Sequence, residues 1–336
     1  MAKNIILNFA LFGIGRIGKI HGKNIFENTK SKLLYVYDTN NNEAIKIAKK
    51  YHCEIAKNPD EALNDKKVNA VLIASPTNTH INLIIKSAKK GKAILCEKPI
   101  DLNIKNIIKC EKLLKKFNIP IQIGFNRRFD NTHAKLKKSC DQGIIGKKEM
   151  IIITSRDPSP PSFGYLKYSG GILRDMTIHD FDISRFILGD DKITEVHAQA
   201  SNIFDKNIKK LNDYDTVMIT MKSQSGVLIH INNSRRAVYG YDQRIEVLGS
   251  KGMLISDNQT PNSMKKFLGT STESKESLYN FFIQRYELAY KNQLNSFIKS
   301  IVNKKLPLAS FKDGKEAIIL ANAAYKSLNT GKTIRL

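Results

Sequence analysis

The spacing of apolar residues divides the chain into two parts. In the first part, short apolar runs rich in β-branched residues alternate with stretches in which apolar residues recur every three or four positions. Such runs predict strands buried on both faces, and the stretches between them predict amphipathic helices. The strands are predicted at residues 5–12, 32–38, 69–75, 92–100 and 119–125. The helices are predicted at residues 17–28, 41–51, 58–65, 80–91 and 103–118.

After about Gly124 the pattern changes to long strands of alternating apolar and polar residues, joined by short turns. This alternation predicts a largely antiparallel open sheet. Its strands are predicted at residues 193–204, 214–223, 226–236, 243–250 and 252–257, and helices at residues 129–141, 169–186, 281–303 and 313–328. We therefore expect a doubly wound parallel α/β domain over residues 1–124. We expect an α+β domain with a mostly antiparallel sheet over residues 125–336.

A glycine motif, GIGRIG, stands where the first predicted strand meets the first predicted helix. Gly13, Gly15 and Gly18 give the spacing GxGxxG. The first glycine permits a tight turn, the second lets the backbone approach a pyrophosphate, and the third lets the helix pack closely on the sheet. Asp38 ends the second strand twenty residues after Gly18, where a carboxylate accepts hydrogen bonds from an adenosine ribose. The motif predicts a Rossmann dinucleotide site.

The residues after Asp38 indicate which dinucleotide binds. Thr39 and a run of asparagines follow, with no arginine to receive a 2′-phosphate, so NAD is favoured over NADP. The alternative is a set of turn glycines with a surface aspartate, which the strand–turn–helix context disfavours.

Two further segments follow strands of the predicted parallel sheet. They are SPTNTH, residues 75–80, and CEKPI, residues 96–100. Ligands of such sheets bind beyond the carboxyl ends of the strands, so both segments are expected at the cofactor site. Pro99 restricts Lys98 to extended geometry. A solvated charge is the alternative role for this lysine.

The stretch SGGILRDMTIHDFDISRF, residues 169–186, places titratable groups among apolar residues. On a continuous helix, Asp175, His179 and Asp182 lie within an arc of roughly 60°. Burying such a row is costly unless its charges have partners. Asp175 and His179 either form a buried, hydrogen-bonded pair that ties the helix to the sheet, or they are part of a catalytic site. Asp182 is left unassigned.

Composition excludes several classes of protein. An apolar content of 41% indicates a globular protein, no apolar run has the length of a membrane span, and the N-terminal residues carry no cleavage-site pattern. Neither His21 nor His80 has another ligand at metal spacing, so we expect no metal site. The scattered cysteines indicate free structural thiols, and free thiols are expected in a reducing cytoplasmic location. These are Cys53, Cys96, Cys110 and Cys140.

The net charge of +24 raises the question of a nucleic-acid partner. The basic excess is mostly lysine spread over predicted helix surfaces, with no arginine-rich stripe and no interleaved aromatic residues. A charge run of this kind is usually a solvated face, so we expect no nucleic-acid partner.

Several motifs together resemble one family. GIGRIG, SPTNTH, EKP, GFNRRFD and GG-x₃-D-x₃-HD-x-D resemble the glucose–fructose oxidoreductases, inositol dehydrogenases and related NAD(P)-dependent sugar dehydrogenases (the Gfo/Idh/MocA family). The resemblance covers essentially the whole chain. TSRDPSPP, the stretch from Ser169 to Phe186 and YGYDQRIEVLGSKG look closest to inositol 2-dehydrogenases. Those enzymes oxidise myo-inositol to 2-keto-myo-inositol.

The resemblance implies a catalytic set of Lys98, Asp175 and His179. His179 would take the hydroxyl proton, Asp175 would fix the imidazole or relay the proton, and Lys98 would stabilise the developing alkoxide. The implied cofactor-binding residues are Gly13, Ile14, Gly15, Arg16, Ile17, Gly18, Asp38, Ser75, Pro76, Thr77, His80, Glu97 and Lys98. The implied substrate-binding residues are Lys98, Asn126, Arg127, Asp157, Asp175, His179 and Tyr239, with Tyr286 a weaker candidate.

The resemblance also implies partners for the chain. It implies NAD as cofactor, a small polyol as substrate, and a homotetramer assembled through the second domain. Several alternatives stay open. The substrate could be scyllo-inositol, chiro-inositol or a pyranose, and the protein could sense NAD without turnover, although Lys98 and His179 are both present. Arg127 or Arg128 could pair with carboxylates of the first domain, and the tyrosines could simply pack.

Overall fold

The computed structural model describes residues 5–336, so the first four residues of the predicted first domain lie outside the described part of the chain. The chain forms two compact units, each built from two segments. Unit 1 comprises Met1–Phe129 and Ala289–Glu316, and unit 2 comprises Asp130–Leu288 and Ala317–Leu336. The predicted fold class is confirmed in both units.

Unit 1 contains a parallel sheet of six strands within its described residues, in the order β3-β2-β1-β4-β5-β6. The strands are β1 (Leu7–Phe12), β2 (Ser31–Tyr37), β3 (Glu54–Ile55), β4 (Ala70–Ile73), β5 (Ala93–Cys96) and β6 (Ile121–Ile123). Every residue of β4 and β5 is buried, as expected for parallel strands covered on both faces. The short edge strand β3 has no clear hydrophobic pattern and was not predicted.

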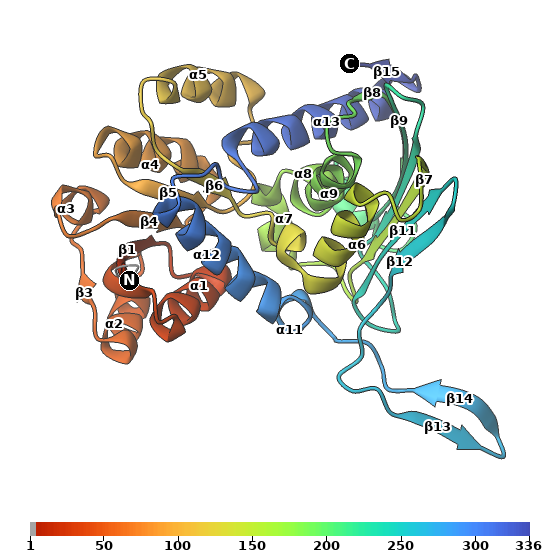
Figure 1. The fold of residues 1–336 in the computed structure, drawn as a ribbon, viewed down its shortest axis with the longest axis horizontal. Coiled ribbons are helices and arrows are strands. Elements are labelled where there is room, and N and C mark those ends of the chain that lie inside the picture. Colours follow the sequence, from red (N-terminus) through yellow and green to blue (C-terminus); the bar gives the residue numbers. More distant parts are fainter. Residues whose placement is uncertain (1–4) are drawn as a thin grey trace. The chain divides into compact units, whose positions relative to one another are not determined.

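Helices lie on both sides of this sheet (Figure 1). They are α1 (Arg16–Glu27), α2 (Asn41–Tyr51), α3 (Pro59–Asn64), α4 (Thr77–Lys89), α5 (Ile104–Leu114), the 3₁₀ turn η1 (Asn126–Phe129) and most of α12 (Glu287–Val302). Three asparagine side chains accept hydrogen bonds from backbone N–H groups in the first turns of α2, α3 and α5. These residues are Asn40, Asn58 and Asn103. The asparagine-rich loops therefore set where these helices begin.

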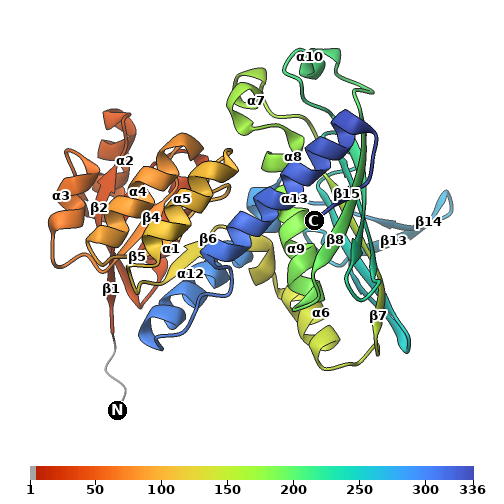
Figure 2. The ribbon, with the colours of Figure 1, turned by 90° about the horizontal axis from the view of Figure 1, so that it is seen from above.

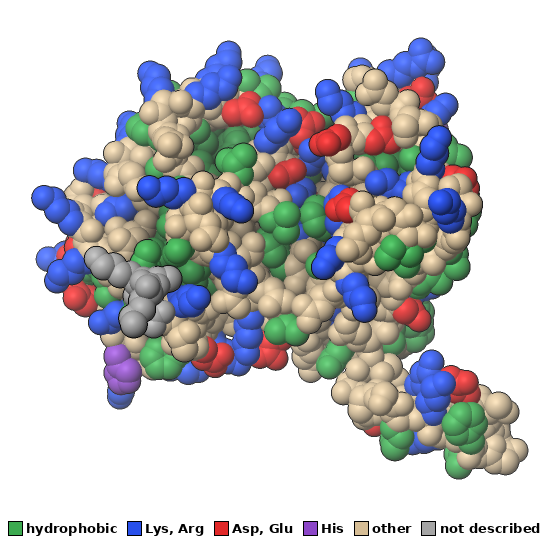
Figure 3. Space-filling model, in the orientation of Figure 1, with side chains coloured by type: hydrophobic (Ala, Val, Ile, Leu, Met, Phe, Trp, Pro, Cys, Tyr) green, Lys and Arg blue, Asp and Glu red, His purple; other side chains and the backbone are tan. Residues whose placement is uncertain are grey.

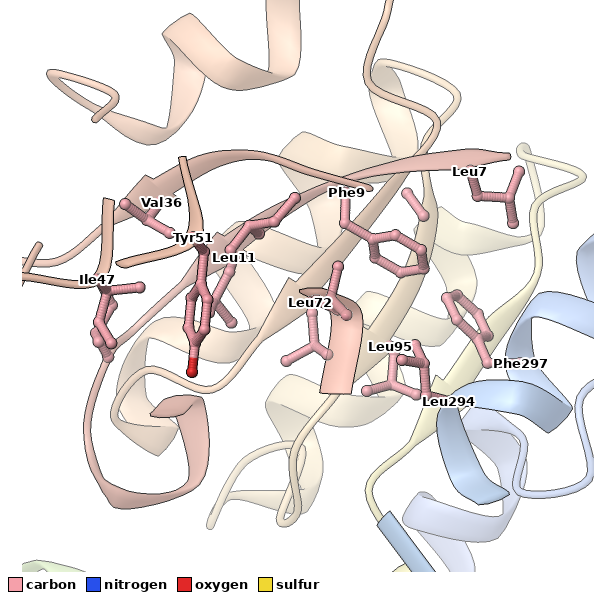
Figure 4. Close-up of a cluster of buried hydrophobic side chains, with 14 of the residues drawn as sticks. Leu7, Phe9, Leu11, Val36, Ile47, Tyr51, Leu72, Leu95, Leu294 and Phe297 are labelled. Carbon is pink, nitrogen blue, oxygen red and sulfur yellow. The ribbon is translucent and has the colours of Figure 1, made fainter. Parts of the chain in front are cut away.

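The second segment of unit 1 completes its hydrophobic core (Figure 4). Leu294, Phe297 and Ile298 of α12 are almost fully buried in one cluster with β-strand residues such as Phe9 and Leu95. The rings of Phe9 and Phe297 lie 6.3 Å apart. The structure therefore differs from a single boundary after residue 124, because the apolar side of α12 packs on the parallel sheet.

Unit 2 contains a seven-stranded sheet in the order β12-β11-β7-β10-β9-β8-β15, and all of its residues are described. Its strands are β7 (Lys148–Arg156), β8 (Ile193–Ser201), β9 (Thr216–Ser223), β10 (Leu228–Ser234), β11 (Asp242–Gly249), β12 (Gly252–Ser256) and β15 (Ile334–Arg335). All neighbouring pairs are antiparallel except β7 and β10. A separate hairpin, β13 (Lys265–Leu268) and β14 (Ser271–Lys275), projects from the unit and was not predicted (Figure 1).

Helices α6 (Asn131–Asp141), α9 (Ile178–Leu188) and the larger part of α13 (Phe311–Thr330) lie along one face of the unit 2 sheet (Figure 2). The other helices of the unit are α7 (Phe163–Ser169), α8 (Ile172–Asp175), α10 (Lys206–Lys209) and α11 (Phe282–Arg285). Ile151, Ile153, Ile229 and Ile231 alternate along β7 and β10 and are almost fully buried. One face of the sheet is thus the core of unit 2, as the alternation predicted.

The predicted continuous helix over residues 169–186 is wrong. The stretch forms the end of α7, then α8, and then α9 up to residue 186. Between α8 and α9, the backbone N–H of Thr177 donates to the carbonyl of Ile172, five residues earlier, in the pattern of a π-turn. This wider turn breaks the 100° spacing, so an arc computed for an ideal helix does not describe Asp175 and His179.

Candidate dinucleotide site and catalytic residues

The glycine loop of unit 1 has the close contacts that a Rossmann turn requires. Gly13 has φ +88°, and a Cβ there would lie 2.4 Å from the backbone nitrogen of Ser75. A Cβ on Gly18 would lie 2.0 Å from the carbonyl oxygen of Gly13. A Cβ on Gly15, in contrast, would meet nothing within 4 Å. The loop is closed on the sheet side and open at Gly15, where a pyrophosphate would approach.

Helix α1 begins directly after this loop. Gly15 is its N-cap, and within this described helix there is no side-chain cap and no acidic residue in the first turn. The first turn contains Arg16, Ile17 and Gly18, three of the predicted cofactor-binding residues. A helix N-terminus without a capping oxygen favours an anion through its dipole and N–H groups. The geometry therefore fits a dinucleotide pyrophosphate.

Asp38 lies just beyond the carboxyl end of β2 and is fixed by backbone donors. The N–H of Ile14 donates to its Oδ2 at 2.5 Å, and the N–H of Asn40 donates to its Oδ1 at 2.8 Å. An open pocket of about 460 Å³ adjoins it and is lined by Tyr37, Asp38, Thr39, Asn41, Ile55, Ala56 and Lys57. A pocket whose walls are partly apolar and partly polar and that contains one carboxylate fits the adenosine half of a dinucleotide. Sequence reasoning missed Lys57, because it comes from a different loop.

The predicted residue His80 is buried and links two loops at the carboxyl ends of β4 and β5. Its Nε2 lies 2.8 Å from the carbonyl oxygen of Ser75, and its Nδ1 lies 2.8 Å from that of Pro99. Burial lowers the pKa of His80, although both carbonyl contacts favour the protonated ring. The ring therefore supports the loops that carry Ser75, Pro76 and Lys98. Thr77 opens α4 beside it.

Glu97 and Lys98 follow β5 and differ in exposure. Glu97 is buried, and its Oε1 lies 2.7 Å from Nε2 of His21. A Cβ on Gly124 would lie 2.5 Å from Oε2 of Glu97, so this carboxylate is enclosed within unit 1. Lys98 is half-buried, and its peptide bond to Pro99 is cis. Of the two predicted residues, Lys98 is the more accessible.

In unit 2, Asp175 ends α8 and contacts residues that the sequence did not mark. Tyr165 Oη donates to its Oδ1 at 2.8 Å. Its Oδ2 lies 3.9 Å from Nη1 of Arg235, a fully buried arginine whose Nη2 donates to Asp213 at 3.2 Å. Tyr165 lies ten residues before Asp175 on a separate helix, and Arg235 and Asp213 lie beside strands far along the chain, so no helical or strand periodicity identified them. His179 is half-buried in the first turn of α9.

Two glycines make the turn that precedes α8. Gly170 has φ 82° and Gly171 has φ 81°, in the region that favours glycine. Tyr325 Oη donates to the carbonyl of Gly170 at 3.0 Å, and a Cβ on Gly171 would lie 2.2 Å from that hydroxyl oxygen. Asp213 Oδ1 accepts the N–H of Ile172 at 2.7 Å. The double glycine therefore permits a close approach that fixes the start of α8.

A buried polar network holds the start of α9, after the wide turn that separates it from α8. Asp180 has no exposed surface, and it accepts hydrogen bonds from Ser155 Oγ at 2.6 Å and Asn233 Nδ2 at 2.9 Å. Thr177 Oγ1 donates to Oδ1 of Asn233 at 2.6 Å. These bonds tie α9 to β7 and β10. The sequence drew attention to Asp182, which is also buried, and missed Asp180 because the ideal-helix spacing placed it off the row.

The remaining predicted substrate residues have mixed environments. Asn126 and Arg127 are buried in η1 of unit 1. Asp157 follows β7, and its N–H donates to the carbonyl of Ser234 at 2.9 Å. Tyr239 is half-exposed, but its hydroxyl donates to Asp242 at 2.7 Å and accepts from Arg156 at 2.8 Å.

Tyr286 and Arg128 each contact residues of their own unit. Tyr286 is 1% exposed and packs edge-on against Tyr241. Arg128 pairs with Asp313 at 3.0 Å within unit 1.

The candidate residues are thus divided between the units. Lys98, Asn126 and Arg127 belong to unit 1 with the dinucleotide motif, whereas Asp157, Asp175, His179 and Tyr239 belong to unit 2. Across residues 5–336, no cluster of three or more His, Cys, Asp or Glu has the arrangement of a metal site. In the same residues, no helix is both long and apolar enough to cross a bilayer. Figure 3 shows Lys and Arg scattered over the drawn face.

Comparison with known proteins accounts for both units. Residues 7–125 match the oxidoreductase family with an NAD-binding Rossmann fold, and residues 133–255 match the GFO/IDH/MocA C-terminal domain. The chain is 44% identical to an inositol 2-dehydrogenase of Rhizobium meliloti, over 98% of this chain and 99% of that protein. It is 41% identical to a myo-inositol 2-dehydrogenase of Thermotoga maritima, over 98% of each. A crystal structure of a myo-inositol dehydrogenase from Corynebacterium glutamicum has a TM-score of 0.95 at 41% identity, covering 99% of both chains.

We predict that Asp38→Ala weakens NADH binding about 10-fold or more and reduces discrimination against NADPH, because the ribose hydroxyls lose a charged acceptor. Fluorescence titration with NADH and NADPH measures both effects. Asp60→Ala is the control. Asp60 on α3 is an exposed carboxylate that pairs with Lys86 on α4, and its removal should leave the affinities for NADH and NADPH unchanged. An unchanged ratio of the two affinities in Asp38→Ala would contradict the assigned role.

Proposed function

Because the chain belongs to the NAD-binding oxidoreductase family with a GFO/IDH/MocA C-terminal domain, we propose that it oxidises a secondary alcohol of a cyclitol with NAD⁺. The most favoured reaction is the conversion of myo-inositol to 2-keto-myo-inositol. The observation that carries this proposal is that Asp175 and His179 flank a structured break between α8 and α9. The same chain is similar to inositol 2-dehydrogenases over nearly its whole length.

In the proposed reaction, each catalytic residue handles a charge that the alcohol develops. Imidazole has an ordinary pKa near neutral, so His179 is suited to accept the hydroxyl proton. Asp175 orients the imidazole and stabilises the imidazolium that forms. The ammonium of Lys98 donates a hydrogen bond to the developing alkoxide. Bound NAD⁺ supplies the hydride acceptor.

Two alternatives to the oxidation of myo-inositol would require different residues of the chain. Another cyclitol, such as scyllo- or chiro-inositol, or a pyranose would use the same catalytic set and differ in contacts from Asn126, Asp157 and Tyr239. A protein that senses NAD without turnover would need neither Lys98 nor His179, and both are present.

We also propose that the chain forms a homo-oligomer, a tetramer by family resemblance, through the open face of the unit 2 sheet. Four exposed apolar side chains lie in register across neighbouring strands of this face, because Leu248 pairs with Met253 and Met150, and Met150 pairs with Leu228. A contiguous apolar row on a sheet face favours burial against a partner.

We further propose a cytoplasmic location for the protein. All four cysteines are free in the described residues, and three of them are buried. Burial raises the pKa of Cys110 to about 12, which keeps this thiol unreactive. Free inert thiols suit a reducing compartment.

The first test of the function is NADH formation, followed at 340 nm as is usual for this cofactor, with a panel of polyols. The panel contains myo-, scyllo- and D-chiro-inositol, glucose and xylose, each with NAD⁺ and with NADP⁺. We expect turnover of myo-inositol with NAD⁺. Turnover of another polyol alone would keep the mechanism and replace the substrate, whereas NADH binding without any turnover would favour the sensor.

We expect Lys98→Ala and His179→Ala each to lower kcat roughly 100-fold or more, because the alkoxide loses its donor or the hydroxyl loses its base. NADH affinity should remain within about twofold, since the dinucleotide motif is intact. Lys116→Ala, an exposed lysine after α5, is the control and should retain full kcat. Near-normal turnover by either catalytic variant would reject its assigned role.

We expect Leu228→Asp to reduce the oligomer mass, because a carboxylate in the apolar row would have to be desolvated at the interface. Multi-angle light scattering measures the mass. Leu306→Asp, at a leucine that is 92% exposed in unit 1, should leave the mass unchanged. A stable monomer formed by the unaltered chain would refute the oligomer proposal.

A further inference from the structure

Arg235 is a fully buried arginine that follows β10 and lies between two carboxylates of unit 2. Its Nη2 donates to Asp213 Oδ2 at 3.2 Å, and its Nη1 lies 3.9 Å from Asp175 Oδ2. Its backbone N–H donates to the carbonyl of Asp215 at 2.9 Å, which fixes the main chain at this point. Within the described residues, neither Nε nor Nη1 makes a hydrogen bond.

A buried guanidinium of this kind needs more than one partner. Desolvating an arginine is costly unless hydrogen-bonded anions surround it. Asp213 supplies one such contact, but its Oδ1 is already committed to the N–H of Ile172. Asp213 is therefore held by two elements and cannot turn to satisfy Nη1. Within residues 5–336, the second carboxylate paired with the guanidinium is Asp175.

Asp175 is held from its other side by a residue of a different kind. Tyr165 on α7 donates to Oδ1 of Asp175, and the tyrosine side chain is 51% exposed. One carboxylate oxygen thus contacts a hydroxyl from an accessible residue, and the other faces a buried cation. These two contacts act on opposite oxygens and constrain the rotation of the carboxylate about its Cβ–Cγ bond.

We propose that Arg235 is a positioning residue that acts through Asp175. Its charge draws Oδ2 of Asp175 toward the interior of unit 2, so that the carboxylate keeps the orientation in which it supports His179. The 3.9 Å separation is an ion-pair distance rather than a hydrogen bond. Asp175 is therefore attracted without being locked, and it can adjust when the imidazole gains a proton. This inference rests on the proposed function, in which Asp175 is part of the catalytic set.

The same arginine connects the site to the double-glycine turn. Asp213 binds both Arg235 and the first backbone N–H of α8, and a Cβ on Gly171 would lie 2.9 Å from Asp213 Oδ1. The position of the guanidinium is thus set by the same carboxylate that sets the start of the helix carrying Asp175.

A double-mutant cycle between Arg235→Lys and Asp175→Asn tests the proposal. Lysine keeps the positive charge, but its single nitrogen cannot face Asp213 and Asp175 at once as Nη2 and Nη1 of Arg235 do. If Arg235 acts through Asp175, Arg235→Lys should therefore lower kcat about 10-fold in the unaltered chain and change it less than about twofold in the Asp175→Asn background. The residual turnover of the Asn variant is measured at raised enzyme concentration. NADH affinity should stay unchanged in every variant, because the dinucleotide motif lies in unit 1.

Two further variants keep the test decisive. Arg174→Lys makes the same substitution on α8, at an arginine that stacks on Tyr325 and binds Asn322, and it should retain kcat within about twofold. If Arg235→Lys does not fold, as judged by thermal unfolding, Arg235→Gln enters the cycle instead. It removes the guanidinium charge that faces Asp175 but keeps a side-chain donor for Asp213, and it should show the same coupling.

Each outcome separates this inference from the proposed function. Equal losses of kcat in both backgrounds would make the effect of Arg235 structural and overturn the inference. No loss in the unaltered chain would also overturn it. Full activity of Asp175→Asn alone would instead reject the catalytic role of Asp175, which belongs to the proposed function.

Discussion

The contact between Asp213 and the start of α8 is the constraint on which the positions of Asp175 and His179 in unit 2 depend. Because Gly170 and Gly171 both take positive φ, the chain can bring the N–H of Ile172 onto Asp213 and pack beneath Tyr325. That contact fixes where α8 begins, and α8 is a single turn long, so it also fixes where Asp175 stands. The wide turn that follows and the bonds of Asp180 then set the start of α9 and His179. Side chains far apart in sequence thus define the short segment that carries Asp175 and His179, the proposed catalytic residues of unit 2.

In unit 1, the loops of the dinucleotide site are held mainly by hydrogen bonds and close contacts of backbone groups. The glycine loop, the carboxylate of Asp38 and the imidazole of His80 are each fixed by main-chain donors or carbonyls. These interactions hold four loops at the carboxyl ends of β1, β2, β4 and β5, where a parallel sheet presents its ligand site. The dinucleotide site therefore requires few specific side chains, which explains why a short motif is sufficient to identify it.

The sequence predicted those parts of the protein that depend on local chain geometry. Gly13, Gly15, Gly18 and Asp38 follow from a strand–turn–helix pattern, and the sheets follow from hydrophobic periodicity. Residues that act across long separations were not predictable: Asp213 and Arg235 lie in or beside strands whose pattern carries no sign of their partners. The ideal 100° spacing also failed at the π-turn between α8 and α9, so a row drawn on one continuous helix did not describe Asp175 and His179, and it left out the buried Asp180. Periodicity showed that α12 is a helix but not which sheet it covers.

The position of α12 has a consequence for how the protein is made. The parallel-sheet unit needs Phe297 and its neighbours to cover Phe9 and Leu95, yet these residues are synthesised after nearly the whole of unit 2. A ribosome-bound chain that ends before α12 carries a sheet with part of its apolar surface uncovered. Final closure of the core then waits for the last tenth or so of the chain, whereas domains otherwise tend to fold in order from the N-terminus. A fragment limited to the N-terminal segment is consequently an incomplete folding unit, even though it contains the whole dinucleotide motif.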